Sequence, residues 1–477
     1  MLHRFLLLLL PLLTTFTASA QQPNVLFIAV DDLRPQLGCY GKTFMTTPHF
    51  DALAKRSVLF ERAYCMVPTC GASRASLMTS LRPHPRRFVT YTARADKEAP
   101  HAKTLNTVFK QNGYTTISLG KVFHNPDDNT DGWSQPPWRP KGDDYSSPAT
   151  VRAAIRQHRS DHPQHKREMR GPAYESADQP DDAYRDHQTT TQAIGYLNDF
   201  STKRNEPFFL AVGFMKPHLP FCAPKKYWDL YDYDQIDVPA NFDRPSDVPD
   251  DAVHTSGELR AYAGIPPTGQ VDRETARHLI HGYYACVSFI DAQIGRLLRT
   301  LDQSGLGNNT IIVLWGDHGW QLGEHSMWNK HSCFETSMLT PLMISAPGIT
   351  GGTKATGLTE FIDIYPTLCD LARIEIPDHV EGKSLLPLLR DPSQPGKPFA
   401  IGRYRSGDTI RSDQFRFSQY RGNRGLGSVS GTMLFNHRQD PDENQNVVAN
   451  PVNESTVELL ARELHARKGK NAAAKSN

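Results

Sequence analysis

The cysteine in the segment Cys70-Gly71-Ala72-Ser73-Arg74 is the side chain of this chain with the greatest potential for covalent chemistry. A cysteine can be a buried thiol, a metal ligand, half of a disulfide or a nucleophile, so the surrounding groups decide its role. Cys65 lies nearby, but no set of cysteines and histidines at zinc-binding spacing accompanies the pair, which argues against zinc. Arg74 lies one helical turn beyond Cys70 if a helix begins here, where it can orient a nucleophile and hold its charge.

Carboxylates follow two apolar runs that read as buried parallel strands. Residues 24–30 lead into Asp31 and Asp32, and residues 310–315 lead through Gly316 into Asp317 and His318. The carboxyl ends of parallel strands meet at one edge of a sheet, where open α/β proteins bind ligands. Neighbouring residues in a regular strand point to opposite faces, so Asp31 and Asp32 converge only if the chain turns there. Three carboxylates gathered in this way suit a hard divalent cation.

Cationic side chains follow other predicted strands. Lys121 and His124 come after a strand over 114–119 and are spaced to share one helical or turn face. His218 follows a strand over 207–214, and Lys330 lies farther along the chain. Fixed cations of this kind stabilise negative charge that develops in a transition state. The other histidines, His158, His162 and His165 among them, are given no role in the site.

These motifs, in this order, resemble the type I sulfatase family over nearly the whole chain. The resemblance rests on five segments and is closest to the iduronate-2-sulfatase branch: Asp31-Asp32, Cys70-Gly-Ala-Ser-Arg, Gly120-Lys-Val-Phe-His, Lys216-Pro-His and Gly316-Asp-His-Gly-Trp-Gln-Leu-Gly-Glu-His. It implies that a maturation enzyme oxidises Cys70 to formylglycine (3-oxoalanine), whose aldehyde hydrate is the nucleophile. The family's maturation signal usually has proline where Ala72 stands, and alanine is a known variant of it.

The resemblance also implies a calcium ion and a role for each site residue. Calcium would be bound by Asp31, Asp32, Asp317, His318 and an oxygen of modified Cys70, although many family members have asparagine in place of His318. Lys121 and Lys330 would bind sulfate oxygens, and Arg74 and His124 would assist the nucleophile. His218 would donate a proton to the leaving group or bind sulfate. As a proton donor it would need a pKa of about 6.5 or somewhat higher.

The substrate implied by this branch is a sulfated polysaccharide or glycosaminoglycan fragment that contains a uronic acid. Its carboxylate needs a cation, for which Arg86, Arg87, Arg403 and Arg405 are candidates. Two alternatives stay open. The same fold hosts phosphodiester and phosphonate monoester hydrolases, and the chain could instead be an inactive carbohydrate-binding relative.

The order of apolar segments predicts an α/β fold in two domains. Residues 21–392 are expected to form a catalytic domain with a central, mostly parallel sheet flanked by helices. Residues 393–477 are expected to form a small α+β subdomain, because 399–405 and 409–420 alternate with the period of antiparallel strands and 457–467 reads as a closing helix. The polar stretch 127–186 shows no periodicity and is interpreted as a surface loop region. Further helices are expected over 47–56, 73–81, 105–112, 186–200, 274–301 and 361–372, and further strands over 58–60 and 341–346.

The N-terminus and the composition bear on location and partners. Arg4, an apolar run over 5–13 and the segment Ala18-Ser19-Ala20 predict a secretory signal peptide over residues 1–20, and hence an exported, periplasmic or secreted protein without a membrane span. The formal net charge of +2 gives no indication of a nucleic-acid partner. Of the seven cysteines, six remain if Cys70 is converted, and their pairing cannot be deduced from the sequence.

Overall fold

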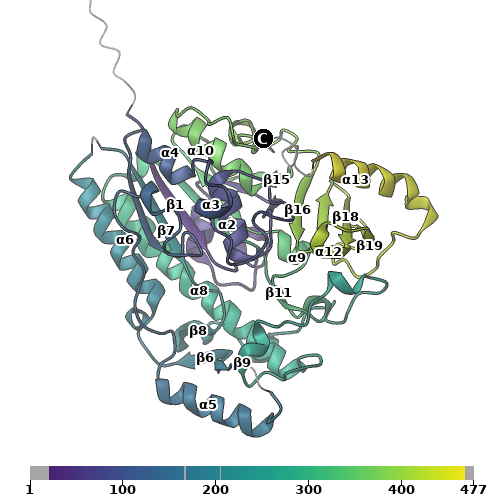
Figure 1. The fold of residues 1–477 in the computed structure, drawn as a ribbon. Helices are drawn as coiled ribbons and strands as arrows, with labels where there is room; N and C mark the ends of the chain where they lie inside the picture. Colours follow the sequence, from purple (N-terminus) through teal and green to yellow (C-terminus); the bar gives the residue numbers. More distant parts are fainter. Residues whose placement is uncertain (1–20, 166–167, 205, 468–477) are drawn as a thin grey trace, which may run out of the picture.

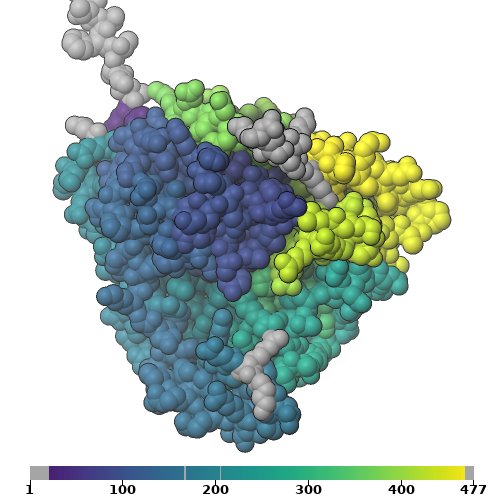
Figure 2. All heavy atoms as spheres, in the orientation of Figure 1, coloured from purple at the N-terminus to yellow at the C-terminus, as the bar shows by residue number. Residues whose placement is uncertain are grey.

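A computed structural model describes residues 21–165, 168–204 and 206–467. The predicted signal peptide lies outside the described residues. The chain folds into a large α/β body and a smaller antiparallel sheet that lies against one side of it, coloured yellow-green in Figure 1. The space-filling view shows the two parts in continuous contact (Figure 2). The predicted fold class is confirmed.

A seven-stranded, mostly parallel sheet forms the centre of the large body. Its strand order is β14-β2-β13-β10-β1-β7-β4, and only β13 runs antiparallel to its neighbours. The strands, in that order, are Thr353–Ala355, Val58–Phe60, Leu342–Ser345, Thr310–Gly316, Asn24–Val30, Phe208–Phe214 and Thr115–Gly120. The central strands β10, β1 and β7 are buried along their whole length, which explains their nearly continuous apolar sequences.

Helices cover both faces of this sheet and create two separate cores. Alternate residues of β1 point to opposite faces: Leu26 and Ile28 belong to one core, and Val25 and Phe27 to the other. The first face is covered by α1 (Pro48–Ala54), α6 (Arg185–Ser201) and α8 (Arg273–Gln303). The second is covered by α2 (Cys70–Thr79), α4 (Leu105–Gln111), α10 (Ile364–Ala372) and α11 (Leu386–Arg390).

The C-terminal sheet supports a loop of the large body. Its four antiparallel strands are β16 (Ala400–Tyr404), β17 (Gly407–Arg411), β18 (Phe415–Arg421) and β19 (Val429–Asn436), and α13 (Glu454–Arg467) packs on it through Leu460 and Leu464. Met433 and Phe435 form a small core with Met327 and Phe334. The loop between those last two residues carries Lys330, so the small sheet fixes the position of a predicted site residue.

Two predicted elements differ from the structure. The segment 127–186 contains a regular helix, α5 (Pro148–Asp161), which begins where the Ser147 side chain accepts a hydrogen bond from the Ala149 amide, and two short strands, β5 (Arg170–Pro172) and β6 (Tyr174–Ala177). Val151, Ala154, Ile155 and His158 are the residues of α5 that are not exposed, and they have the i, i+3, i+4, i+7 spacing of one helical face. The interpretation of the whole segment as aperiodic overlooks this short stripe. The helix α2 begins at Cys70 rather than Ser73, so the candidate nucleophile is itself the first helical residue.

The remaining small elements connect these parts. They are α3 (Ala95–Glu98), α7 (Lys225–Trp228), α9 (Glu335–Met338), α12 (Gly422–Gly425) and the strand pairs β3–β15 (Ala63–Tyr64, Thr359–Glu360), β5–β9 (β9 Tyr262–Ala263), β6–β8 (β8 Phe221–Pro224) and β11–β12 (Gln321–Leu322, Trp328–Asn329). Within the described ranges, none of the helices combines the length and the apolar character needed to cross a membrane. All seven cysteines lie in these ranges, and each has a free thiol.

Candidate active site

The three aspartates meet at the carboxyl edge of the sheet, as their positions in the sequence predict. Strands β1 and β10 pair in parallel with Val30 opposite Gly316, so Asp31 and Asp317 leave the sheet side by side. Asp32 adopts a left-handed conformation with φ 59°, and its amide donates a 3.0 Å hydrogen bond to Asp317 Oδ1. This turn removes the strand alternation and brings the carboxylates of Asp31 and Asp32 into one cluster.

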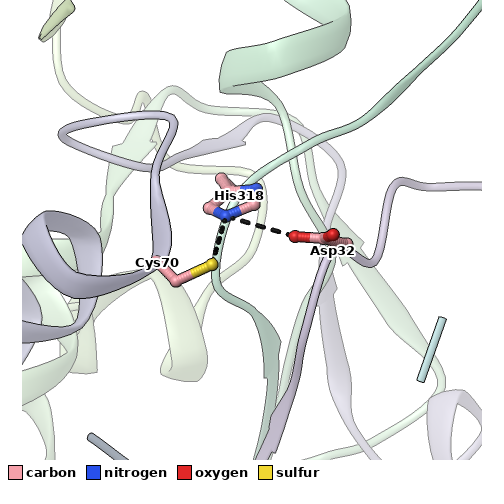
Figure 3. A group of neighbouring side chains, drawn as sticks. All are labelled: Asp32, Cys70 and His318. Atoms are coloured by element: carbon pink, nitrogen blue, oxygen red, sulfur yellow. Dashed lines mark hydrogen bonds and ion pairs between the residues drawn. The ribbon is translucent and has the colours of Figure 1, made fainter. Parts of the chain in front are cut away.

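Cys70 lies at the start of α2 against this carboxylate cluster. Its Sγ is 3.4 Å from His318 Nε2, and the same nitrogen is 3.4 Å from Asp32 Oδ1 (Figure 3). The thiol is buried, and burial together with the nearby Asp31 carboxylate raises its pKa to about 12. Unmodified Cys70 is therefore a neutral thiol at physiological pH and a poor nucleophile.

Arg74 holds the carboxylates in place rather than contacting Cys70. Its guanidinium is fully buried. Nη2 donates a hydrogen bond of 2.9 Å to Asp31 Oδ1, and Nε donates one of 2.9 Å to Asp317 Oδ2. Nη1 donates to the Val122 carbonyl. The sequence predicts that Arg74 can orient the nucleophile and hold its charge. In the structure it joins the ends of β1 and β10 to the loop after β4.

Lys121 and His124 lie on that loop but differ in their contacts. The Lys121 ammonium forms a buried ion pair with Asp31 Oδ2. His124 makes no hydrogen bond or ion pair with the other site residues in the described part of the chain, and its ring packs edge-on against Tyr91 at a centroid distance of 5.7 Å. Burial and Lys121 lower the pKa of His124 to about 3, so its imidazole is neutral and can accept a hydrogen bond.

His218 and Lys330 both lie near Asp32 Oδ2 and share a further acidic partner, Glu258, that the sequence did not reveal. Lys330 Nζ is 3.2 Å from Asp32 Oδ2 and 3.0 Å from Glu258 Oε2, and His218 Nε2 is 2.9 Å from Glu258 Oε1. Burial and then Lys330 lower the pKa of His218, while Glu258 opposes them, so the expected pKa of 6.5 or above is not found. Glu258 lies in a loop without periodicity or a recognisable motif, and no sequence signal could have identified it.

The site has the ligand atoms and the negative charge that would bind a divalent cation. Oxygens, nitrogens and sulfur of Asp31, Asp32, Cys70, Asp317 and His318 fall within 4.8 Å of one another in overlapping groups. Asp32 Oδ1 is buried without a hydrogen-bond partner. Although burial works against it, Lys121 and Arg74 hold the pKa of Asp31 well below its usual range, whereas burial raises the pKa of Asp32 well above it. Lys330 therefore compensates Asp32 only in part, at Oδ2, and a hard cation with oxygen ligands would supply further positive charge beside Oδ1.

This geometry suits the hydrolysis of an anionic ester, because buried fixed cations surround a nucleophile position at the edge of an α/β sheet. A family model described as "Sulfatase" matches residues 23–374, and one described as "N-sulphoglucosamine sulphohydrolase, C-terminal" matches residues 323–470. The chain belongs to the sulfatase family, and the predicted activity of a sulfuric ester hydrolase is confirmed.

Similarity to individual proteins agrees with this assignment. The chain is 34% identical over 435 residues to iduronate 2-sulfatase of Homo sapiens, covering 80% of this chain and 78% of that protein. It is 33% identical over 453 residues to a sulfatase of Formosa agariphila, covering 92% and 85% of the two chains. The structure also resembles phosphonate monoester hydrolase from Silicibacter pomeroyi with a TM-score of 0.72, 23% identity and coverage of 93% and 95%, a likeness of fold alone.

Proposed function

We propose that this sulfatase removes sulfate from a uronate-containing polysaccharide or glycosaminoglycan fragment, using formylglycine at position 70 and a calcium ion. The observation that carries the proposal is the convergence of Cys70, three aspartates and His318 at the carboxyl edge of the sheet. The similarity to iduronate 2-sulfatase supports the substrate class. We further propose that the protein is exported after cleavage of residues 1–20 and that a maturation enzyme modifies Cys70.

When present, formylglycine would supply a hydroxyl nucleophile on its hydrated aldehyde, and calcium would neutralise the sulfate oxygens. The residues of the chain position and balance these groups. Arg74 fixes Asp31 and Asp317, while Lys121 and Lys330 lie on two sides of the carboxylate cluster, where each can attract a sulfate oxygen. His218 presents Nε2 on the same side as Lys330, where it can bind a sulfate oxygen or, when the ring is protonated, give a proton to the departing alkoxide.

Leaving-group dependence tests the role of His218. We expect His218→Ala to lower kcat on a sulfated uronate disaccharide by about 10²- to 10⁴-fold, the usual contribution of a general acid. It should lower kcat on para-nitrophenyl sulfate far less, because that phenolate departs without protonation. Lys121→Ala or Lys330→Ala should reduce both rates, since sulfate charge must be neutralised in either case. Equal losses on both substrates for His218→Ala would assign it to sulfate binding and make His124 the next candidate for the acid.

Of the four candidate arginines for the substrate carboxylate, the structure favours Arg405. The Arg403 side chain is buried beside Asp408 at 3.3 Å, and Arg87 donates to the Arg82 carbonyl at 2.7 Å. Arg405 is exposed, and its guanidinium lies 5.3 Å from the centre of the Tyr404 ring. Tyr404 in turn stacks on His331, the residue after Lys330, at 5.4 Å. Arg405 is thus linked, through the stacked rings of Tyr404 and His331, to the part of the site that contains Lys330.

A carboxylate-binding role for Arg405 predicts a substrate-selective effect. We expect Arg405→Ala to raise KM for the uronate disaccharide by about tenfold, the value of one charge-assisted hydrogen bond. KM for para-nitrophenyl sulfate, which has no carboxylate, should be unchanged. Arg86→Ala is the matched control, since Arg86 is also exposed and, within the described residues, stacks on no ring that leads to Lys330. A rise in KM for both substrates would contradict this role.

The phosphonate monoester hydrolase alternative rests on the shared fold alone. Measuring kcat/KM for sulfate and phosphonate monoesters of one phenol would decide between the two activities. A preference for the phosphonate would overturn the proposal. No turnover of any ester by protein shown to carry formylglycine and calcium would favour an inactive carbohydrate-binding relative.

A further inference from the structure

A cation that the proposed chemistry does not use lies beside His124. The Nη2 nitrogen of Arg139 donates to the Phe123 carbonyl at 2.6 Å and to the His124 carbonyl at 2.9 Å. Its Nε and Nη1 nitrogens make no hydrogen bond to a described residue and are not buried. Within residues 21–165, 168–204 and 206–467, Arg139 also forms no ion pair with a carboxylate. Its charge and these N–H groups are therefore available to a ligand.

The backbone places Arg139 at the same edge of the sheet as the other site residues. Trp138 pairs in parallel with the end of β4: its carbonyl accepts from the Gly120 amide at 2.8 Å, and its amide donates to the Ser118 carbonyl at 2.9 Å. Arg139 follows directly and so emerges at the carboxyl edge, beside the loop that begins at Lys121. This is the edge at which open α/β sheets bind ligands.

The charge of Arg139 lies within reach of the carboxylate cluster. Burial and then Arg74 lower the pKa of Arg139 to about 10, while Asp31 opposes them, so the guanidinium stays charged near neutral pH. An oxyanion bound to Arg139 would offset the repulsion from Arg74. The planar fork of a guanidinium matches the geometry of a carboxylate and of other oxyanions.

An exposed aromatic ring stands on the other side of His124. The Tyr91 side chain is 59% exposed, and its ring lies edge-on to His124 at 5.7 Å. A Cβ atom on Gly71 would lie 2.0 Å from the Tyr91 carbonyl oxygen, so glycine is needed for this approach to the start of α2. Asn125 Nδ2 donates to the Ala93 carbonyl at 3.3 Å, which joins the Tyr91 segment to the His124 loop. The ring is thus fixed beside the candidate nucleophile, where its apolar face can pack on a substrate.

We propose that Tyr91 and Arg139 form a subsite for a sugar ring that carries a second oxyanion, a carboxylate or a sulfate group, besides the sulfate that is cleaved. Tyr91 packs on the sugar ring, and Arg139 binds the second oxyanion through Nε and Nη1. The two residues flank His124, whereas Arg405 is linked to Lys330. This inference rests on the proposed sugar sulfate substrate and adds a second charged group to its description.

Three sugar sulfates that differ in the second anion test the subsite. A hexose monosulfate has none, a hexose disulfate has a sulfate, and a sulfated uronate has a carboxylate. We expect Arg139→Ala to raise KM for at least one of the two dianionic sugars by about 10- to 100-fold, the value of a charge-assisted hydrogen bond. KM for the hexose monosulfate and for para-nitrophenyl sulfate should change by no more than about twofold.

Two further variants identify the anion. The dianionic sugar whose KM rises in Arg139→Ala carries the group that Arg139 binds, and Arg405→Ala in the same assays shows whether the uronate carboxylate depends on Arg405 instead. Arg139→Lys keeps the charge but loses the fork, so it should recover part of the affinity.

The role of the ring and a matched control complete the experiment. Tyr91→Ala should raise KM for all three sugars by about three- to tenfold, whereas Tyr91→Phe should not. Arg204→Ala is the control, because Arg204 also donates to two backbone carbonyls, Ser201 at 3.3 Å and Ser304 at 3.1 Å. These carbonyls lie where α6 and α8 end, before β7 and β10 begin, and so at the opposite edge of the sheet. Arg204→Ala should leave every KM unchanged.

The same measurements can contradict the subsite. If Arg139→Ala raises KM for the hexose monosulfate as much as for the dianionic sugars, or changes KM for none of them, Arg139 only supports the His124 loop. An unchanged KM in Tyr91→Ala would refute the role of the ring. If the wild type cleaves para-nitrophenyl sulfate but none of the sugars, the proposed substrate is wrong. The subsite is then tested by the Kd of the hexose disulfate and of the sulfated uronate from calorimetric titration, and Kd values equal in the wild type and Arg139→Ala would overturn it.

Discussion

Cys70→Ala is expected to abolish sulfatase activity on both sugar and aryl sulfates while the protein remains folded. Loss of a catalytic nucleophile typically costs on the order of 10⁶-fold in kcat. Cys70 is the first residue of α2 and packs beside His318, so removing its sulfur leaves the hydrogen bonds of Arg74 and the strand pairing untouched. The measurement is kcat for both substrates together with the melting temperature.

The chemical form of position 70 can be read from one tryptic peptide. Cleavage after Arg62 and Arg74 releases residues 63–74, which contain both Cys65 and Cys70. We expect active protein to give a peptide that is alkylated once, at Cys65, and that reacts with a hydrazine at position 70. Cys65 is a buried thiol near the Ser337 carbonyl and serves as the internal control.

Two results would contradict a formylglycine at position 70. One is full activity from protein whose peptide is alkylated twice. The other is retention of activity in Cys70→Ala. Cys65→Ala is the matched variant, because it removes a buried sulfur five residues away without touching the site, and it should remain active with a modest loss of stability from the small cavity.

The site residues that the sequence predicted correctly as neighbours share one property, which is their place at the end of a strand. Asp31, Asp317 and Lys121 follow β1, β10 and β4, and the topology of a parallel sheet brings such positions to one edge. The convergence of Asp31 and Asp32 additionally required a turn, and the left-handed conformation of Asp32 provides it. Their roles in catalysis stay predictions.

What the sequence could not show depends on contacts between distant, irregular segments. Glu258 enters the site because its loop is tied to Asn329 and Trp328, and nothing in the sequence near Glu258 encodes that pairing. The choice among four arginines likewise needed the structure, since only burial and ion pairing distinguish Arg403 from Arg405. The helix α5 is a different case, because its short apolar stripe at Val151, Ala154 and Ile155 is present in the sequence but lies within a long polar segment.

Loss of the metal is the second change expected to have a large effect. Asp32→Asn tests it with the least disturbance of the other site contacts. Asp32 Oδ1 has no hydrogen-bond partner among the described residues, and Oδ2 pairs with Lys330 at 3.2 Å. The substitution therefore weakens one ion pair but leaves the pairs of Arg74 with Asp31 and Asp317 in place. We expect calcium binding to be lost and kcat to fall by at least about 10³-fold, since a fixed charge at the developing negative centre is removed. The melting temperature of the wild type should rise with added calcium, whereas that of Asp32→Asn should not respond.

Asp317→Ala should lose the metal as well, but at a much greater cost in stability. Asp317 pairs with Arg74 at 2.9 Å, and both side chains are fully buried. Removing one partner of such a pair costs about 3–5 kcal/mol. Asp317→Asn keeps an oxygen for Arg74 and should separate the two effects, with activity lost and most of the stability retained. The measurements are metal content by mass spectrometry, the melting temperature with and without calcium, and kcat. Zinc bound by Cys70 and histidines, or full activity in protein shown to contain no calcium after chelation, would refute the calcium assignment.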